Sequence, residues 1–399
     1  MPERVGIAIV GGGVLGCATA WELARRGHRP LLLERGDLGC AISGASLAAV
    51  TRHLVSAPAE LGFVMDSCDR WDAMADELRA ATGIDIELDR TGQLRIVEQG
   101  DGMHEALADV AQGVEHERAL GLDVRMVDAA EVAVIAPALN PDVVAGGSFC
   151  PVDGKLNPLA TVRALAAAAR LAGAELRTGV RVLGIEPGDP VRLRTTRGDV
   201  EADRVVVAAG PWSQMLLAPL DERLSLGLVP KRAQCCATAA VPPVIAPVLA
   251  SVSVGIADGY TQLHQTRAGQ VLFNTVVPSA DPRDGDDLVS AVDAHFLVES
   301  AQTLVRLLPA LRDAPLQRSW DACESWTGDH RLAIGEVPAA PGVVVCSGDS
   351  GTGFLRAPAA ARAVAAIIDG VAPDFDLEPY APGRTGLDDG AALAEALHA

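Results

Sequence analysis

The stretch Val5-Gly6-Ile7-Ala8-Ile9-Val10-Gly11-Gly12-Gly13-Val14-Leu15-Gly16 decides the fold of this chain. Its apolar first half predicts a short buried strand, and its second half reads G-x-G-x-x-G. A helical pattern follows over 14–26 and closes at Gly27. A second apolar run, 31–33, then ends in Glu34, which comes 18 residues after Gly16. Strand, glycine turn, helix, strand and acid therefore stand in the order of a βαβ dinucleotide-binding unit.

Each residue of this unit has a physical role in binding a dinucleotide. Gly11 allows the tight turn, Gly13 lets the backbone approach a pyrophosphate, and Gly16 lets the helix pack closely on the strand. The helix N-terminus offers unpaired N–H groups and the positive end of a dipole to the phosphates. The carboxylate of Glu34 can accept hydrogen bonds from a ribose. The sequence therefore predicts a dinucleotide site.

Related patterns recur in the middle and at the end of the chain. Val205 to Gly210 is an apolar strand that ends in glycine, and 343–346 is a strand followed by a glycine-rich turn over 348–353. Hairpin-like segments, such as 260–275, lie between these patterns. We therefore expect an α/β fold in which a Rossmann-like domain is interleaved with a mixed α+β domain. The expected ranges are 1–50, 151–215 and 320–372 for the first domain, 51–150 and 216–319 for the second, and 373–399 for a C-terminal tail.

Local patterns predict several further elements. Residues 35–46, rich in Gly, Ser and Ala, are expected to form a loop. Helices are expected over 59–81, 164–172 and 358–368, and strands within 85–97 and at 174–176 and 180–182.

Composition excludes several classes of protein. The 399 residues carry a formal net charge of −19, which argues against nucleic-acid or anionic-membrane partners. No run of 18 apolar residues predicts a membrane span, and the N-terminus lacks the pattern of a secretory signal. The eight cysteines show no C-x-x-C pair or zinc spacing, so we expect no metal site. Reduced thiols favour the cytoplasm.

Four motifs in order carry a resemblance to a known family. They are the opening turn with Glu34 and the loop Ser43-Gly44-Ala45-Ser46; Asp153 to Pro158 ahead of a helix; Ala208-Ala209-Gly210-Pro211-Trp212-Ser213; and Ser347-Gly348-Asp349-Ser350-Gly351-Thr352-Gly353-Phe354. Over nearly its whole length the chain resembles the FAD-dependent amine and amino-acid oxidoreductases grouped with D-amino-acid oxidase and glycine oxidase. Within that family, Gln265-Thr266-Arg267-Ala268-Gly269 is similar to a hairpin of the opine and hydroxyproline dehydrogenase β-subunits.

The resemblance implies a cofactor, a reaction and partners. It implies FAD, bound non-covalently, and oxidation of a C–N bond in an amine, amino acid or opine-type secondary amine by hydride transfer to flavin N5. It also implies a partner subunit or an electron acceptor other than oxygen. The implied cofactor-binding residues are Gly11, Gly13, Val14, Leu15, Gly16, Glu34, Arg35, Ser43, Gly44, Val182, Ala209, Gly210, Trp212, Gly348, Ser350, Gly351, Thr352, Gly353 and Phe354.

One position departs from the family pattern in a way that affects the substrate. Relatives commonly read S-W-A-G-L-R-P-x-T-x-D-G, and residues 319–330 align with that pattern without gaps. Glu324 stands where the arginine would clamp a substrate carboxylate. Glu324 could bind a substrate ammonium or help to remove its proton; another cation, such as Arg52, Arg331, His53 or His264, could hold the carboxylate; or Glu324 could pair structurally with an arginine.

The candidate catalytic residues are therefore Glu324, His53, His264 and Arg331. Cys323 lies one residue from a position where some relatives attach FAD covalently. A lysine that some relatives use beside the flavin for oxygen activation corresponds to Leu272, which favours a dehydrogenase. Two alternatives stay open: oxidation of a 2-hydroxy acid on the same scaffold, and an FAD-binding subunit that relays electrons without a substrate of its own.

Overall fold

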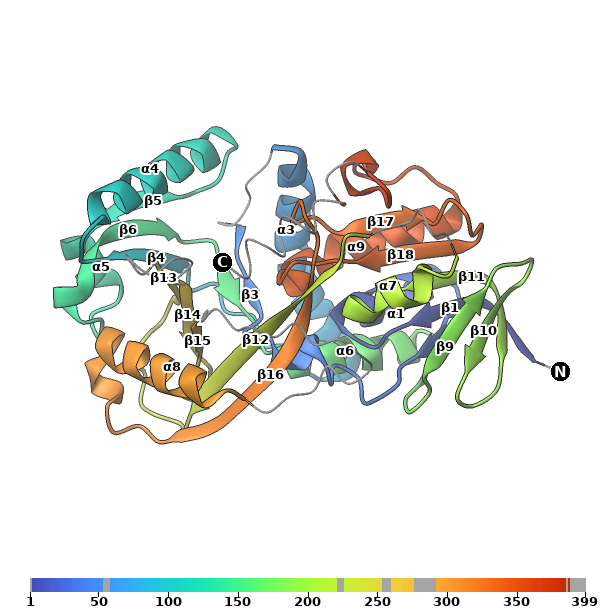
Figure 1. Ribbon diagram of the computed structural model, residues 1–399, viewed down its shortest axis with the longest axis horizontal. Coiled ribbons are helices and arrows are strands. Elements are labelled where there is room, and N and C mark those ends of the chain that lie inside the picture. Colours follow the sequence, from blue (N-terminus) through green and yellow to red (C-terminus); the bar gives the residue numbers. More distant parts are fainter. Residues whose placement is uncertain are drawn as a thin grey trace.

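The computed structural model describes residues 2–52, 58–220, 226–252, 260–275, 292–384 and 387. Two large sheets lie in opposite halves of the molecule (Figure 1). The first sheet has the strand order β17-β18-β11-β1-β2-β8, with β10 and β9 continuing from β11. Its strands are β1 (Glu3–Val10), β2 (Leu31–Leu33), β8 (Glu175–Arg177), β9 (Val182–Glu186), β10 (Val191–Thr195), β11 (Val200–Val207), β17 (Ala333–Glu336) and β18 (Val343–Ser347).

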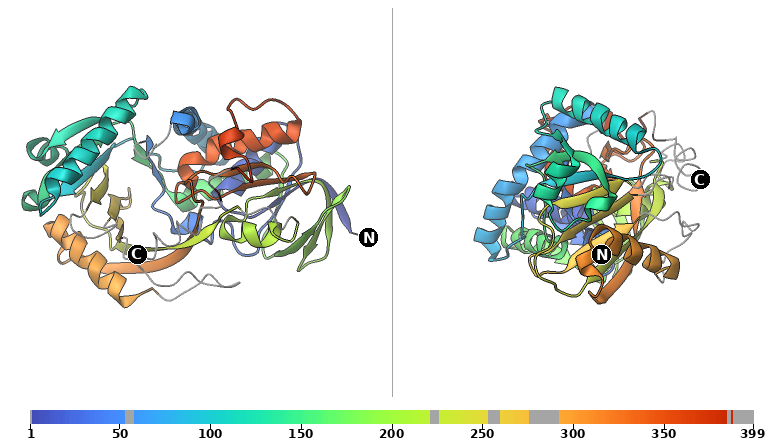
Figure 2. Two further views of the ribbon diagram at one scale, coloured as in Figure 1. Left: turned by 45° about the horizontal axis from the view of Figure 1, so that its top comes forward. Right: turned by 90° about the vertical axis from the view of Figure 1, so that its left-hand side faces the viewer.

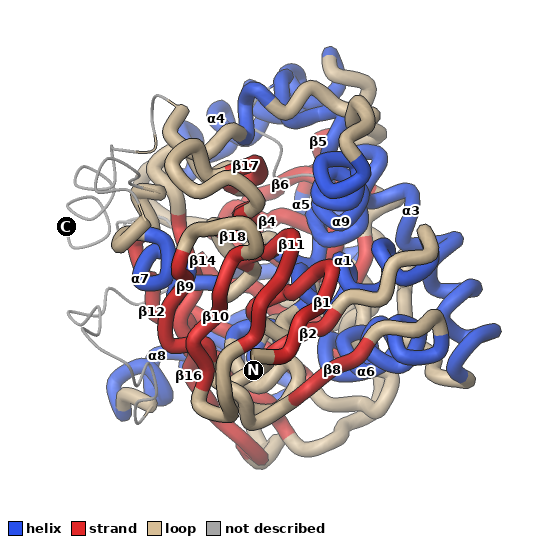
Figure 3. Tube along the Cα trace, turned by 90° about the vertical axis from the view of Figure 1, so that its right-hand side faces the viewer, coloured by secondary structure: helices blue, strands red, loops and turns tan. Residues whose placement is uncertain are grey.

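The central strands of the first sheet, β8, β2, β1, β11 and β18, run parallel. Figure 3 shows them side by side from the end of the molecule. Helices α1 (Val14–Arg25), α6 (Pro158–Leu171) and α9 (Gly353–Asp369) pack together on one face. Alternate residues of β1 enter two different cores: Ile9 packs toward these helices, and Val10 toward β9, β10 and α7 (Ser213–Leu217). Burial on both faces explains the unbroken apolar pattern of the strand.

The second sheet is mixed and has the order β16-β12-β15-β14-β13-β4-β6-β5. Its strands are β4 (Gln93–Glu98), β5 (Arg125–Asp128), β6 (Val144–Cys150), β12 (Val229–Thr238), β13 (Val248–Val252), β14 (Tyr260–Gln265), β15 (Val271–Thr275) and β16 (Leu316–Trp326). Helices α4 (Met103–Ala119), α5 (Ala129–Ile135) and α8 (Ala294–Leu307) pack against it. Strands β12 and β16 are long antiparallel partners that reach from α8 toward the first sheet (Figure 2).

The remaining elements link the two halves. Strands β3 (Ala49–Val50) and β7 (Gly154–Lys155) pair with each other, and α3 (Pro58–Thr82) packs on α6 and α9. The α/β arrangement predicted from the sequence is confirmed. The division into domains remains our proposal, and its boundary at 320 falls within β16. Of the helices that the structure describes, none is both long enough and apolar enough to cross a membrane.

Several predicted elements differ in extent. The segment 35–46 contains a short helix, α2 (Ile42–Ala45), and was therefore wrongly predicted as loop throughout. Helix α6 begins at Pro158, close to the predicted start after Asn157-Pro158, and extends the Ala/Leu-rich part predicted over 164–172. The Asn157 side chain accepts a hydrogen bond from the backbone N–H of Ala160 and caps the first turn. Helix α9 begins at Gly353 rather than at 358, so Pro358 lies inside it.

Candidate cofactor groove and active site

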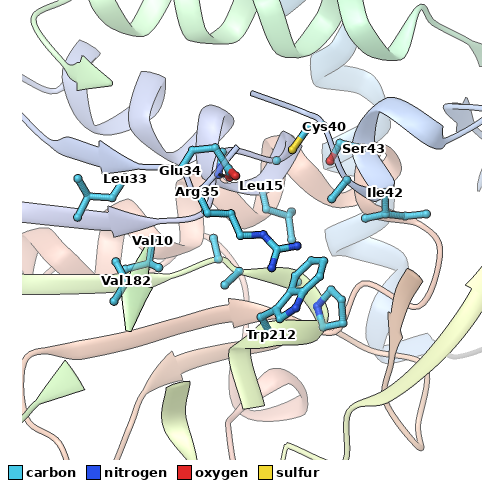
Figure 4. Close-up of a pocket in the computed structure, with 18 of the residues that line it drawn as sticks. Val10, Leu15, Leu33, Glu34, Arg35, Cys40, Ile42, Ser43, Val182 and Trp212 are labelled. Atoms are coloured by element: carbon cyan, nitrogen blue, oxygen red, sulfur yellow. Dashed lines mark hydrogen bonds between the residues drawn. The ribbon is translucent and has the colours of Figure 1, made fainter. Parts of the chain in front are cut away.

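A groove lies at the carboxyl ends of the parallel strands β1, β2 and β11 (Figure 4). This is where open α/β sheets bind nucleotides. The residues that line the groove come from segments far apart in the sequence. The lining residues are Val10 to Leu15, Leu33 to Arg35, Gly39 to Ser43, Val180 to Leu183, Ala208 to Trp212, Met215, Leu216 and Asp349.

The glycine turn packs too tightly for any side chain. At Gly11, which has φ +111°, an added Cβ would lie 2.3 Å from the carbonyl oxygen of Ala208. At Gly16 it would lie 2.0 Å from the carbonyl oxygen of Gly11. These clashes explain why the strand, turn and first helical residues need glycine at both positions. The backbone N–H of Val14, in the first turn of α1, donates to Ser43 Oγ over 2.9 Å.

Glu34 is buried at the end of β2. Its two carboxylate oxygens accept hydrogen bonds from the backbone N–H groups of Gly12, at 2.6 Å, and Gly36, at 2.8 Å. Hydrogen bonds to a carboxylate are stronger than those between neutral groups. Glu34 therefore joins the glycine turn to the end of β2 and brings a negative charge to the floor of the groove.

The side chains of Arg35 and Trp212, which both line the groove, are in direct contact. The guanidinium carbon of Arg35 lies 3.7 Å from the centroid of the Trp212 ring, and Figure 4 shows the two side chains stacked. Val182 lines the groove, as the family resemblance implied. The groove offers the Glu34 carboxylate, the N–H groups at the start of α1, and flat apolar and aromatic walls. These features fit the ribose, the pyrophosphate and the rings of FAD, respectively.

The glycine-rich turn before α9 meets the last residues of β16. The backbone N–H of Ser350 donates to the carbonyl of Ser325 over 2.9 Å, and the N–H of Thr327 donates to Ser350 Oγ over 3.2 Å. Asp349 is the residue of this turn that reaches the cofactor groove. We refer to residues 348–353 as the glycine turn of α9. Ser325 Oγ also donates to Asp349 over 3.1 Å, so hydrogen bonds to Ser325 and to Thr327, just past the strand, join the groove to the second sheet.

Glu324 lies against this turn. An added Cβ at Gly351 would lie 3.2 Å from Glu324 Oε2. The indole N–H of Trp326 donates to the same oxygen over 2.7 Å. Burial raises the pKa of the Glu324 carboxyl, while the Trp326 hydrogen bond and Lys231 oppose that rise. Asp349 is nearby, and burial raises the pKa of its carboxyl as well.

Lys231 was not singled out in the sequence, yet it is the direct cross-strand partner of Glu324. Its Nζ lies 4.1 Å from the centroid of the Trp326 ring, and the ring of His330 meets Trp326 edge-on at 5.1 Å. Only the register of β12 on β16 reveals that pairing, because the two residues are far apart in sequence. Asp349 lay within a quoted motif but was not given a role.

A second cavity lies on the other side of the segment 43–47. Gly44 and Ser46 line it, together with Lys155, His264, Leu272 and Trp320. The ring Nε2 of His264 is 2.7 Å from the carbonyl of Leu47, whereas Nδ1 has no hydrogen-bond partner among the described residues. Burial, aided by Lys155, lowers the pKa of His264 to about 4. His264 is therefore neutral near pH 7.

The structure separates the predicted catalytic residues. Glu324 lies at the glycine turn of α9, and His264 lies in the second cavity. Arg331 lies in the turn after β16, where its carbonyl accepts hydrogen bonds from Thr327 and Arg384, and it lines neither of these cavities. His53 lies outside the described residues. Arg52 forms ion pairs with Asp69 and Asp153.

The predicted cofactor residues are also distributed over more than one place. Gly44 was predicted to hold the cofactor, but it lines the second cavity instead of the groove. Gly16 acts through packing on Gly11. Phe354 is buried, with its carbonyl bonded to Trp71. The remaining residues before α9, including Gly348, Ser350 and Thr352, shape the turn that presents Asp349.

The sequence matches the family of FAD dependent oxidoreductases over residues 6–367. The chain belongs to this family. A glycine oxidase from Geobacillus kaustophilus is 30% identical over 388 residues, which cover 96% of this chain and 98% of the relative. Its crystal structure superposes with a TM-score of 0.86 at 27% identity, over 95% of this chain and 98% of that one. A subunit of the opine oxidase of Rhizobium meliloti is 29% identical over 354 residues, covering 87% of this chain and 89% of the relative.

Membership of the FAD dependent oxidoreductase family confirms the predicted fold and cofactor. The protein is an FAD-dependent oxidoreductase with a glycine oxidase-like fold. The groove of Figure 4, whose lining includes Asp349, is the place in this structure that suits the cofactor.

Proposed function

We propose that the protein oxidises the carbon–nitrogen bond of a small amine, amino acid or opine-type secondary amine, with FAD held non-covalently in the groove. The observation that carries this proposal is the junction of the groove with the polar group Lys231, Glu324 and Trp326. There the carboxyl group of Glu324, with Trp326 and Lys231 beside it, lies against the glycine turn of α9, whose Asp349 lines the groove. The similarity to glycine oxidase and opine oxidase supports the same reaction class.

The chain contributes orientation and charge. FAD, when bound, accepts the hydride that leaves the carbon next to the substrate nitrogen. The N–H groups at the start of α1 would hold the pyrophosphate, and Glu34 would bind the ribose. Burial raises the pKa of the Glu324 carboxyl, which makes it a better acceptor for a proton from a substrate amine. Orientation of the reacting bond above the ring is expected to supply most of the rate enhancement.

Non-covalent attachment is supported by the direction of Cys323. Successive side chains of a strand point to opposite faces, so Cys323 points away from the face that carries Glu324. Its thiol approaches the carbonyl of Glu324 at 3.6 Å. Cys323 is therefore poorly placed to form a bond with a flavin that lies beside Glu324.

A partner protein forms part of the proposal because one relative is itself a subunit of an opine oxidase. Such a partner would accept electrons from the reduced flavin. Leu272 stands where some relatives are expected to have a lysine for oxygen activation, which favours an acceptor other than oxygen. The cytoplasm is the proposed location, because the described cysteines form no disulfide and are mostly buried thiols.

The test is an anaerobic visible spectrum of purified protein before and after addition of a substrate panel. The panel contains amino acids, opines, N-methylated amines and 2-hydroxy acids. Bleaching of the oxidised flavin by one of the amine classes supports the proposal. Bleaching by 2-hydroxy acids alone replaces C–N oxidation with alcohol oxidation. A flavin band that no compound bleaches supports an electron-relay role and contradicts independent catalysis.

A further inference from the structure

The cation missing from position 324 is present on the neighbouring strand. In the family pattern an arginine occupies the position of Glu324, and in this chain Lys231 of β12 is paired with Glu324 in the β12–β16 ladder. Side chains of directly paired residues point to the same face and start about 5 Å apart. A lysine is long enough to place its charge where an arginine at 324 would place its own.

The surroundings hold the Lys231 side chain over this face. Its ammonium lies 4.1 Å from the centroid of the Trp326 ring, a cation–π contact. Trp326 in turn donates its indole N–H to Glu324, and Glu324 packs against Gly351 in the glycine turn of α9. The ammonium is thus held at the end of the β12–β16 pair that packs against the glycine turn of α9.

We propose that Lys231 is the substrate-carboxylate anchor of this enzyme, with the role of the family arginine moved across the ladder from β16 to β12. This inference rests on the proposed function, because it names a binding group for the same substrates. In it, Trp326 is a positioning residue that fixes the direction of the ammonium, and Glu324 lies beside the ammonium on the same face. The ligand class is a small amine that carries a carboxylate.

Glu324 is less suited to be the primary anchor of a substrate cation. Its carboxylate already accepts the Trp326 hydrogen bond and lies beside the ammonium of Lys231, so a second cation would have to compete with that ammonium. An ammonium carries three donors, so Lys231 can keep its contacts with the protein and still bind a carboxylate oxygen.

Four other cations of the two halves already have partners that the structure describes. Arg52 is buried between Asp69 and Asp153, and Arg232, the neighbour of Lys231 on the opposite face of β12, pairs with Asp321. Lys155 donates to Thr91 and to the carbonyl of Ala246 in the second cavity. Arg318 stacks on Trp320, six residues before Glu324 on β16. At about 3.3 Å per residue, that places it about 20 Å away along the strand.

The experiment measures binding of acetate to the oxidised FAD-loaded protein through the change in the flavin spectrum. Acetamide serves as the neutral probe of the same shape, and methylammonium as the cationic probe. We expect Lys231→Met to weaken acetate binding by about tenfold or more, the loss typical of one charge-assisted hydrogen bond. Lys231→Arg should stay within about threefold of wild type, and acetamide binding should be unchanged in both variants.

Two further variants make the test specific. Arg318→Met removes a cation from the same face of β16 and should leave acetate binding unchanged. The exchange Lys231→Glu with Glu324→Arg returns the cation to β16 and should restore acetate binding that Lys231→Glu alone abolishes. This rescue would not occur if Lys231 were only a structural residue.

Three results would overturn the inference. They are a wild-type protein whose flavin spectrum does not respond to acetate, equal acetate affinity in Lys231→Met and wild type, and methylammonium binding that is lost in Glu324→Gln. The reaction itself is judged separately by anaerobic bleaching with the substrate panel. If an amine bleaches the flavin while Lys231→Met binds acetate normally, only the anchor is wrong; if no amine bleaches it, C–N oxidation is wrong.

Discussion

The indole N–H of Trp71, in α3, donates a hydrogen bond to the backbone carbonyl of Phe354, in α9, over 2.8 Å. That carbonyl would normally accept from the N–H of residue 358, but residue 358 is a proline and has none. Trp71 thus satisfies a carbonyl that the proline leaves without its helical donor. Because Phe354 follows the glycine turn of α9, the bond also fixes the start of the helix beside the groove.

We predict that Trp71→Phe lowers the free energy of unfolding by about 1–3 kcal/mol, since the buried carbonyl loses its partner and the site loses volume. Urea denaturation in saturating FAD measures the change. Trp21→Phe is the control, because Trp21 is also a buried helical tryptophan and its ring contacts Arg25 at the surface. Equal losses in the two variants would contradict a role for the hydrogen bond.

Glu34→Gln should weaken FAD binding by about tenfold or more. The amide presents N–H groups toward the backbone donor of either Gly12 or Gly36, so one charge-assisted bond is replaced by a clash of donors. Fluorescence titration of the apoprotein with FAD gives the dissociation constant. The surface variant Glu22→Gln, which alters an ion pair with Arg26, should bind FAD normally. Normal affinity in Glu34→Gln would refute the assigned role.

Gly351→Ala tests the packing of Glu324 on the glycine turn of α9. Gly351 has φ +78°, and the added methyl would lie 3.2–3.4 Å from the Glu324 carboxyl group. Gly83 has nearly the same φ, +73°, with no atom within 4 Å of its added methyl, so Gly83→Ala isolates the backbone cost of about 1 kcal/mol.

We expect both alanine variants to lower the melting temperature, and only Gly351→Ala to alter acetate binding and the flavin spectrum. The melting temperature and the acetate titration are measured on the same FAD-loaded samples. An unchanged acetate affinity in Gly351→Ala would show that Glu324 does not contact the turn as described.

His264 gives a pH dependence of stability. Its folded pKa, about 4, lies below the value of about 6.5 expected in the unfolded chain, so the unfolded state binds the proton more readily. Stability from this group is complete above about pH 6.5 and is lost as the pH falls from there toward 4. In His264→Gln the unfolding free energy should fall less between pH 7 and 5. An imidazole resonance assigned to His264 that titrates near pH 6.5 in the folded protein would contradict this prediction.

The sequence predicted the parts of the fold whose signal is local. The strand over 5–10, the glycine turn and Glu34 were correctly placed, because chain geometry and close packing force those residue types at those positions. The hairpin of β14 and β15 was also correctly predicted from its alternation and its central turn.

What could not be predicted depends on pairing between distant residues. The sequences of β12 and β16 show no clear alternation of apolar and polar residues. The pairing of Lys231 with Glu324 follows only from the register of the two strands. The early start of α9 was missed because a proline usually marks a helix boundary. The helical hydrogen bond that Pro358 cannot donate is replaced by one from Trp71, which lies 287 residues earlier in the chain. Sequence reasoning grouped His264 with Glu324 as candidates, but the fold places them at separate sites.

The groove is built from segments that stretch from Val10 to Asp349, and none of them forms a nucleotide site alone. FAD therefore recognises the folded chain and has little affinity for the unfolded one. At a free concentration 100 times its dissociation constant, such a ligand adds about 2.7 kcal/mol to the stability of the native state. We therefore expect the flavin-free protein to unfold, and to be cut by proteases, more readily than the FAD-loaded protein.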